Sequence, residues 1–102
     1  MSLSAAASAL APNPVAEKFS EQGHSFLQEG NAHAAEQHFR KAVELTGGKD
    51  KVYAFALAQA RLANKDIPGA IEAFRVAHRA APSWFAPKEA LEMLGASLNG
   101  SK

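Results

Sequence analysis

Two short stretches decide the fold: Ala35–Ala42, AEQHFRKA, and Ala70–Ala77, AIEAFRVA, in which the pattern that begins at residue 35 returns at residue 70. In each stretch an alanine, a phenylalanine and a second alanine are spaced by four and then three residues, so they line one face of an α-helix. Small alanines let two helix backbones approach closely, and Phe39 or Phe74 fills the space beside them. The sequence therefore predicts two equivalent helices that pack through the same face.

The repeat extends beyond these two stretches. At the same offset Leu27 falls on Leu62, and the turn residue Asn31 falls on Asp66. One pair of helices cannot cover its own apolar face, so repeated pairs must stack on one another. The predicted fold class is therefore all-α, with two antiparallel helical hairpins and a further helix that covers the end of the stack.

Capping and helix-breaking residues divide the chain into five predicted helices. Asn13 can accept a hydrogen bond from a first-turn amide, and Pro14 suits the first helical position. Gly47 and Gly48 allow the left-handed backbone that ends many helices, and Pro82 prevents continuation. The predicted helices cover residues 14–28, 32–46, 51–63 and 67–80, and a fifth runs from Ser83 or Ala86 to near Leu98.

Composition indicates one small domain. At 102 residues the chain has room for a single domain, which we place at residues 14–98, between a flexible Ala/Ser-rich tail at 1–13 and a C-terminal tail at 99–102. Its net charge of +1 gives no field that would attract nucleic acid. The lack of cysteine excludes disulfides and thiol chemistry. No apolar run approaches the roughly 18–20 residues that span a bilayer, and no Lys or Arg precedes the apolar N-terminal part as in an export signal. We expect a cytoplasmic protein that binds neither nucleic acid nor membrane.

The repeated pattern resembles the tetratricopeptide repeat (TPR) family, whose unit is an antiparallel helix pair of about 34 residues. The first unit matches the family pattern at Phe19, Gly23, Phe26, Ala35, Phe39 and Ala42, and the second at Leu57, Ala70, Phe74, Ala77 and Pro82. Family positions are changed at Gln22, Gly47, Ala54, Ala58 and Arg61. The resemblance implies a short right-handed α-solenoid, with repeat one over residues 16–48, repeat two over 51–82 and a capping helix over 84–98.

The resemblance also implies a binding surface, because the first helix of each pair lines the concave side of such a stack. There the protein would hold a peptide or helical segment of another protein. The candidate groove residues are Glu17, Ser20, Glu21, His24, Gln28, Val52, Phe55, Gln59, Leu62, Glu89 and Met93. Phe55 is either a groove residue or a core residue, and Trp84 is either a packing residue or an anchor for the partner.

The fifth predicted helix should bury several apolar side chains against the stack. These are Trp84, Phe85, Ala90, Leu91, Leu94 and Leu98.

One family activity is not expected here. Many chaperone-adaptor TPR proteins grip a terminal carboxylate with lysine, asparagine and arginine on concave positions. In this sequence those positions are occupied by Ser20, His24, Ala56, Ala86 and Ala90. We therefore do not expect a carboxylate clamp.

Catalysis, metal binding and cofactors are not expected either. His33 and His38 are five residues apart and do not converge on one ion, because helical metal pairs use spacings of three or four. Gly47-Gly48 lacks the spacing and preceding strand of a phosphate loop, and no serine stands on a strand-turn-helix elbow. Basic residues gather between Arg40 and Arg79, which indicates either a solvated convex face or a site for an acidic partner.

Three binding roles remain open from the sequence. The leading hypothesis is a non-catalytic protein–protein interaction adaptor that uses the concave groove. A self-assembling module is an alternative, because a second copy could close an apolar concave face. A small bacterial secretion-type chaperone that holds an export substrate is another alternative, since some export chaperones resemble short TPR proteins.

Overall fold

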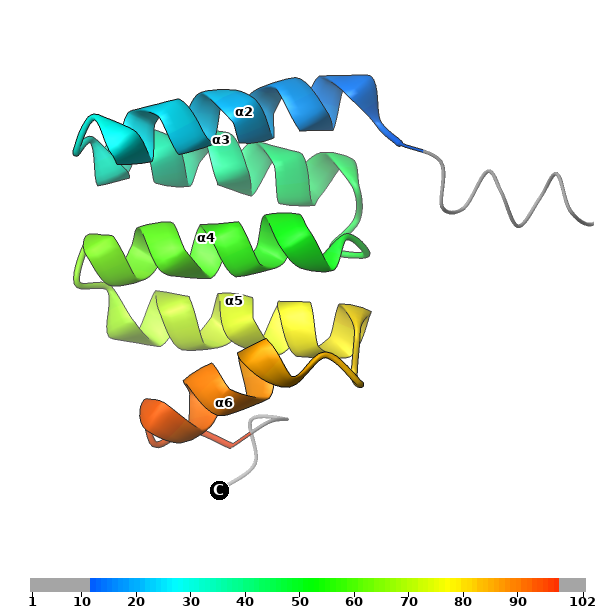
Figure 1. Cartoon of the computed structure of the whole chain (residues 1–102), viewed down its shortest axis with the longest axis vertical. Helices are drawn as coiled ribbons and strands as arrows, with labels where there is room; N and C mark the ends of the chain where they lie inside the picture. The colour runs from blue at the N-terminus through cyan, green and yellow to red at the C-terminus, as the bar shows by residue number, and fades with distance from the viewer. Residues whose placement is uncertain (1–11, 98–102) are drawn as a thin grey trace, which may run out of the picture.

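The computed structural model describes residues 12–97, and this part of the chain forms five α-helices and no strand (Figure 1). The helices are α2 (Pro14–Gln28), α3 (Ala32–Leu45), α4 (Lys51–Ala63), α5 (Ile67–Ala80) and α6 (Phe85–Met93). The expected all-α fold is confirmed, and the first four helices begin and end within one residue of their predicted bounds.

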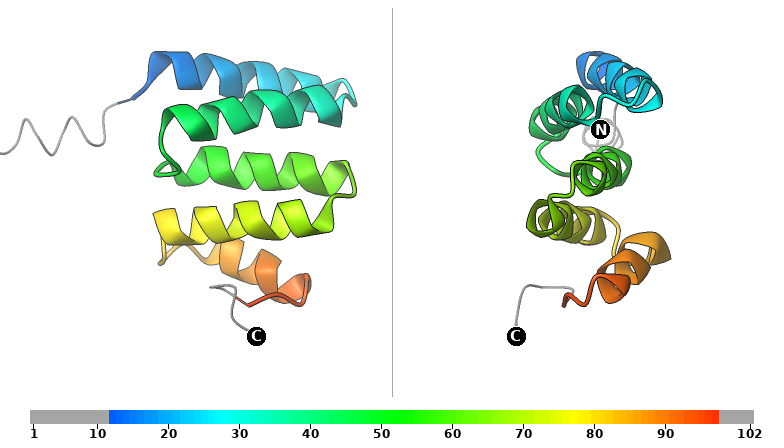
Figure 2. Two further views of the ribbon diagram at one scale, coloured as in Figure 1. Left: turned by 180° about the vertical axis from the view of Figure 1, so that it is seen from behind. Right: turned by 90° about the vertical axis from the view of Figure 1, so that its left-hand side faces the viewer.

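The helices form two hairpins, α2–α3 and α4–α5, which stack side by side with α6 across the end (Figure 1). Seen along the helices, α2, α4 and α6 make one layer while α3 and α5 make the other (Figure 2). The molecule measures 45 × 34 × 17 Å. Its shortest dimension corresponds to two helices, each about 10 Å across.

The core consists of the repeated phenylalanines and alanines that the sequence indicated. Phe39 and Phe74 are buried, and so are the alanines on either side of each ring. The flanking alanines are Ala35, Ala42, Ala70 and Ala77. Gly23 of α2 lies directly on the Phe39 ring, where a Cβ atom would come within 2.6 Å of a ring carbon. A glycine is therefore required at this helix crossing.

Both hairpin turns have the same geometry. Gly30 and Lys65, which are equivalent in the repeat, both adopt a left-handed backbone, with φ of 82° and 63°. The amide of Gly30 donates to the Leu27 carbonyl at 3.0 Å, and that of Lys65 donates to the Leu62 carbonyl at 2.9 Å. The turn is therefore repeated as faithfully as the core, although only one of the two positions has a glycine.

Polar caps start the first four helices. The side chains of Asn13, Asn31, Asp50 and Asp66 each accept a hydrogen bond from an amide two or three residues later. Such a cap satisfies amides that the helix leaves without an internal partner. Asn31 and Asp66, which the sequence placed in equivalent turns, are thus the N-caps of α3 and α5.

The fifth helix is shorter than predicted. It begins at Phe85 and ends at Met93, because Gly95 takes a φ of 72° and the Ala96 amide donates to the Leu91 carbonyl at 2.9 Å. Leu91 is fully buried as expected, whereas Phe85, which was also expected in the core, is 60% exposed. The buried predictions for Ala90 and Leu94 hold in part, since both are partly buried against the core.

Three sequence predictions fall at least partly outside the described residues. These are the N-terminal tail at 1–13, of which only 12 and 13 are described, the burial of Leu98, and the C-terminal tail at 99–102.

Arg61 links the two hairpins. Its Nε donates to the Glu36 carboxylate of α3 at 3.2 Å, and its Nη1 donates to the Gly69 carbonyl of α5 at 3.1 Å. Asn64 adds a hydrogen bond from its Nδ2 to the same Glu36 carboxylate at 3.0 Å. Arg61 and Asn64 thus form a polar connection between the two hairpins.

Candidate functional site

Helix α4 is the central helix of its layer and exposes only one narrow stripe. Its neighbours in the chain, α3 and α5, cover one side, and α2 and α6 flank it in the layer (Figure 2). Val52 and Gln59 are exposed, and Phe55 and Leu62 are half-buried. These four residues are spaced by three, four and three, so they lie on one helix face. They are the four α4 residues that the sequence assigned to the groove.

In the ribbon, the backbone of α4 is set back between those of α2 and α6 (Figure 2), so we call the outward side of these three helices the concave face. We define the concave face by its residues on the three helices. They are Glu17, Glu21, His24 and Gln28 on α2, Val52, Phe55, Gln59 and Leu62 on α4, and Phe85, Glu89 and Met93 on α6. All are exposed except the half-buried Phe55 and Leu62.

Aromatic side chains fill the centre of the concave face. The Phe55 ring meets the edge of the buried Phe74 ring at a centroid distance of 5.2 Å and the Trp84 ring at 5.0 Å. Lys51 places its Nζ 5.4 Å from the centre of the Trp84 ring, a cation–π contact. Phe55 is therefore both a core residue on its inner side and part of the concave face on its outer side. Trp84, half-buried, occupies the same intermediate position.

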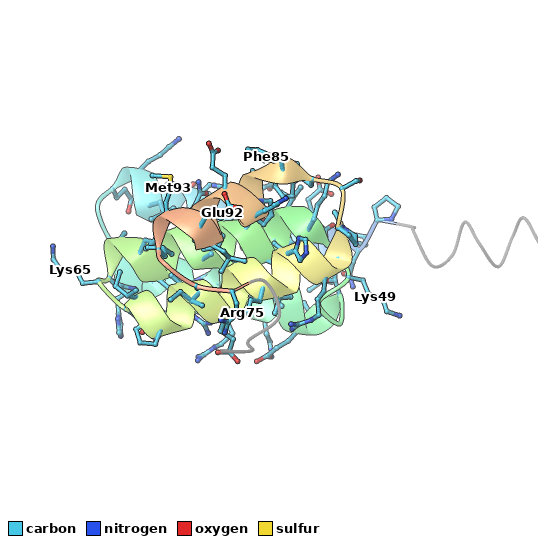
Figure 3. The ribbon with its side chains drawn as sticks, turned by 90° about the horizontal axis from the view of Figure 1, so that it is seen from below. Lys49, Lys65, Arg75, Phe85, Glu92 and Met93 are labelled. Carbon is cyan, nitrogen blue, oxygen red and sulfur yellow. The ribbon has the colours of Figure 1, made fainter. Side chains whose placement is uncertain are left out.

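Three large apolar side chains of α4 and α6 are exposed. Val52 is 50% exposed, Phe85 60% and Met93 81%. Phe85 and Met93 stand at opposite ends of α6, Phe85 toward the Lys49 end of the molecule and Met93 toward the Lys65 end (Figure 3). A gathering of exposed apolar side chains on one face is typical of a surface that contacts another molecule.

The α2 edge of the concave face is acidic. Glu17 and Glu21 lie one turn apart and are exposed. Burial, chiefly, and then the carboxylates of Asp50, Glu17 and Glu21 raise the pKa of Tyr53 on α4. The Tyr53 hydroxyl therefore keeps its proton at neutral pH and remains a hydrogen-bond donor beside a negatively charged edge.

Sequence reasoning missed Tyr53, and it assigned one residue to the groove that does not reach it. Tyr53 adjoins Val52 in the sequence, but its place near Glu17 and Glu21 depends on how the two hairpins stack. Ser20 is 6% exposed, because it lies on the buried stripe of α2 with Ala16 and Gly23. It therefore offers almost no surface to a ligand.

His24 occupies an intermediate position at the edge of the concave face. It is exposed, and its ring packs edge-on against Phe39 at a centroid distance of 4.8 Å. One side of the imidazole thus covers the core, while the rest remains available to solvent.

Residues 12–97 contain neither a metal-binding cluster nor a membrane-spanning helix. No group of three His, Cys, Asp or Glu side chains there could hold a metal ion. Nor does any helix in that range combine the length and the apolar character needed to cross a bilayer.

No protein-family model matches the sequence, and no curated protein matches it.

Proposed function

We propose that the protein is a TPR-type adaptor, without catalytic activity, that holds a peptide or a helical segment of another protein on its concave face. One observation carries this proposal: Val52, Phe85 and Met93 expose apolar surface on α4 and α6, and the rings of Phe55 and Trp84 are in contact and half-buried. The repeated, buried Ala-x3-Phe-x2-Ala pattern and the matching turns support the assignment to the TPR family.

The chemistry of the face indicates the kind of segment it would bind. Apolar residues of the segment would lie against Phe55 and its exposed apolar neighbours, where removing them from water contributes about 25 cal/mol per Å². A lysine or arginine would stand opposite Glu17 and Glu21. The Tyr53 hydroxyl, which stays protonated, is available to donate a hydrogen bond to a backbone carbonyl.

Selection of peptides from a random displayed library tests the proposal directly. We expect the wild-type protein to enrich peptides in which a basic residue accompanies large apolar residues. The double variant V52E/F85E should bind these peptides about tenfold more weakly or worse, because it places charge where apolar surface is buried. Both residues are exposed, so the variant should keep the helical circular dichroism of the wild type.

A matched control uses Ile67, which is also exposed and apolar but lies at the start of α5, outside the concave face. I67E should bind the selected peptides as the wild type does. If no peptide is enriched, or if V52E/F85E binds as well as I67E, the adaptor proposal is wrong.

A homodimer is the second candidate, and the exposure of Phe85 and Met93 on the terminal helix favours it. A second copy could cover this apolar surface through a two-fold interface. Sedimentation of the wild type and of V52E/F85E at two protein concentrations separates the candidates. A dimer that persists at low micromolar protein and is lost in the variant would favour self-assembly over peptide binding.

A further inference from the structure

The opposite layer of the molecule carries a hollow between α3 and α5. At one end a cavity of about 450 Å³ is lined by Val43, Gly47, Gly48, Lys49, Val76, Arg79 and Ala80. A smaller one of about 180 Å³ continues from it over α4 and shares Val43 and Val76. We call these two cavities together the basic groove. Along α5 they extend from Glu72 to Ala80, which at 1.5 Å per residue is about 12 Å, or just over two turns of a bound helix.

The floor of the basic groove is apolar. Val43 of α3 and Val76 of α5 line both cavities, and Ala54, Leu57 and Ala73 line the smaller one. A floor of this kind suits small or branched apolar side chains and offers nothing to a sugar–phosphate chain. It therefore favours a peptide over a nucleic acid.

The rim of the basic groove has cations without partners. The side chains of Arg40, Lys49 and Arg79 make no hydrogen bond and no ion pair with any residue in the described range 12–97. Arg61, which also lines the groove, is already paired with Glu36 and Glu72. Three positive charges are thus left available around an apolar floor.

The acidic residues of the groove, Glu44 and Glu72, line its smaller cavity only. Glu44 lies 3.8 Å from Lys41 on its own helix, and Glu72 lies 3.9 Å from Arg61. The larger cavity has Lys49 and Arg79 in its lining and no acidic residue at all. Its end of the groove is therefore complementary to negative charge.

From this complementarity we infer that the basic groove is a second docking surface, which binds a short acidic peptide segment of a partner protein with apolar residues between its carboxylates. The carboxylates pair with Lys49 and Arg79 at one end and with Arg40 at the side. The apolar residues lie on Val43 and Val76. This surface is on the opposite layer from the concave face and takes peptides of the opposite charge.

The same displayed library tests the inference, because it contains peptides for both surfaces. We expect a second enriched class in which Asp or Glu flanks Leu, Val or Ile. These acidic peptides should bind K49E/R79E about tenfold more weakly or worse than the wild type. The neutral variant K49Q/R79Q should give an intermediate loss, since it removes the attraction without adding repulsion.

A matched control carries the same change in net charge elsewhere. Lys18 on α2 and Lys88 on α6 are exposed and lie outside the groove, so K18E/K88E should bind the acidic peptides nearly as the wild type does. Thermal melting of the three variants establishes that each is folded. V52E/F85E should still bind the acidic peptides, because its changes lie on the concave face. Binding at the basic groove can therefore be tested independently of binding at the concave face.

Three outcomes would overturn the inference. One is the absence of any acidic class among the enriched peptides. Another is an equal loss of affinity for the acidic peptides in K49E/R79E and K18E/K88E, which would show that the loss comes from the change in net charge alone. The third is binding of a duplex DNA oligonucleotide with the same dependence on Lys49 and Arg79, which would show a surface for anions in general.

Discussion

At the scale of single residues, the two repeats differ in the residue that occupies the hairpin turn. Gly30 and Lys65 occupy equivalent turns with nearly the same hydrogen bonds, yet only Lys65 has a Cβ atom in the left-handed region. For an L-residue that conformation costs about 1–2 kcal/mol, a cost that glycine does not bear. The second turn therefore carries strain that the first turn lacks.

Replacing Lys65 with glycine should stabilise the protein. The relief of strain exceeds the extra chain entropy of glycine in the unfolded state, and we expect a net gain of about 0.5–1 kcal/mol. Urea denaturation measures it. Lys65→Ala serves as the control for loss of the charge, and it should not gain stability. If the glycine variant is no more stable than the alanine variant, the backbone at residue 65 is not strained.

At the scale of helices, the contact between hairpins depends on one polar cluster as well as on apolar packing. Arg61 of α4 bonds to Glu36 of α3 and to a carbonyl of α5, so three helices meet at one guanidinium. The Arg61 and Glu36 side chains are only 15% and 20% exposed. A charged hydrogen bond in such a place is worth more than one on the surface.

Removing Arg61 should loosen the junction between the hairpins. We expect Arg61→Ala to cost about 1.5–3 kcal/mol, because Glu36 loses its charged partner while remaining mostly buried. Arg40→Ala, on the exposed side of α3, should cost about 0.5 kcal/mol or less. Chemical denaturation of these two variants, of Glu36→Ala and of the double variant R61A/E36A gives the coupling energy between Arg61 and Glu36. Additive losses from the two single changes would show that the pair does not act as a unit.

The elements also mark the limit of what the sequence could predict. Caps and glycines fixed the first four helices, since those signals act within a few residues. Helix α6 ends at Met93 and not near Leu98 as predicted, because Gly95 takes a left-handed backbone there. Arg61, Tyr53 and the basic groove were missed or left open, because each depends on which helices become neighbours. Such proximity cannot be read from one helix at a time.

At the scale of the whole molecule, the two hairpins depend on each other. Phe39 and Phe74 are buried in one continuous core that also takes in Leu57 of α4 and Leu91 of α6. Neither hairpin has a separate core of its own. Folding should therefore be a single cooperative event across the stack.

Phe74→Ala tests this cooperativity. Truncating a buried phenylalanine costs about 3–5 kcal/mol, and we expect the whole helical signal to melt in one transition at a lower temperature. Phe85→Ala, which changes an exposed ring, should melt close to the wild type. A two-step melt of Phe74→Ala, with about half the helical signal retained in the first step, would mean that the first hairpin folds alone. Circular dichroism across a thermal ramp distinguishes these results.

The slenderness of the stack has a consequence for any assembly built on it. With the shortest dimension at 17 Å, the concave face and the basic groove lie back to back. If both surfaces are occupied, the two bound segments are separated by little more than a pair of helices. A protein of this shape would then serve as a thin spacer that holds a basic segment and an acidic segment close together without letting them pair with each other.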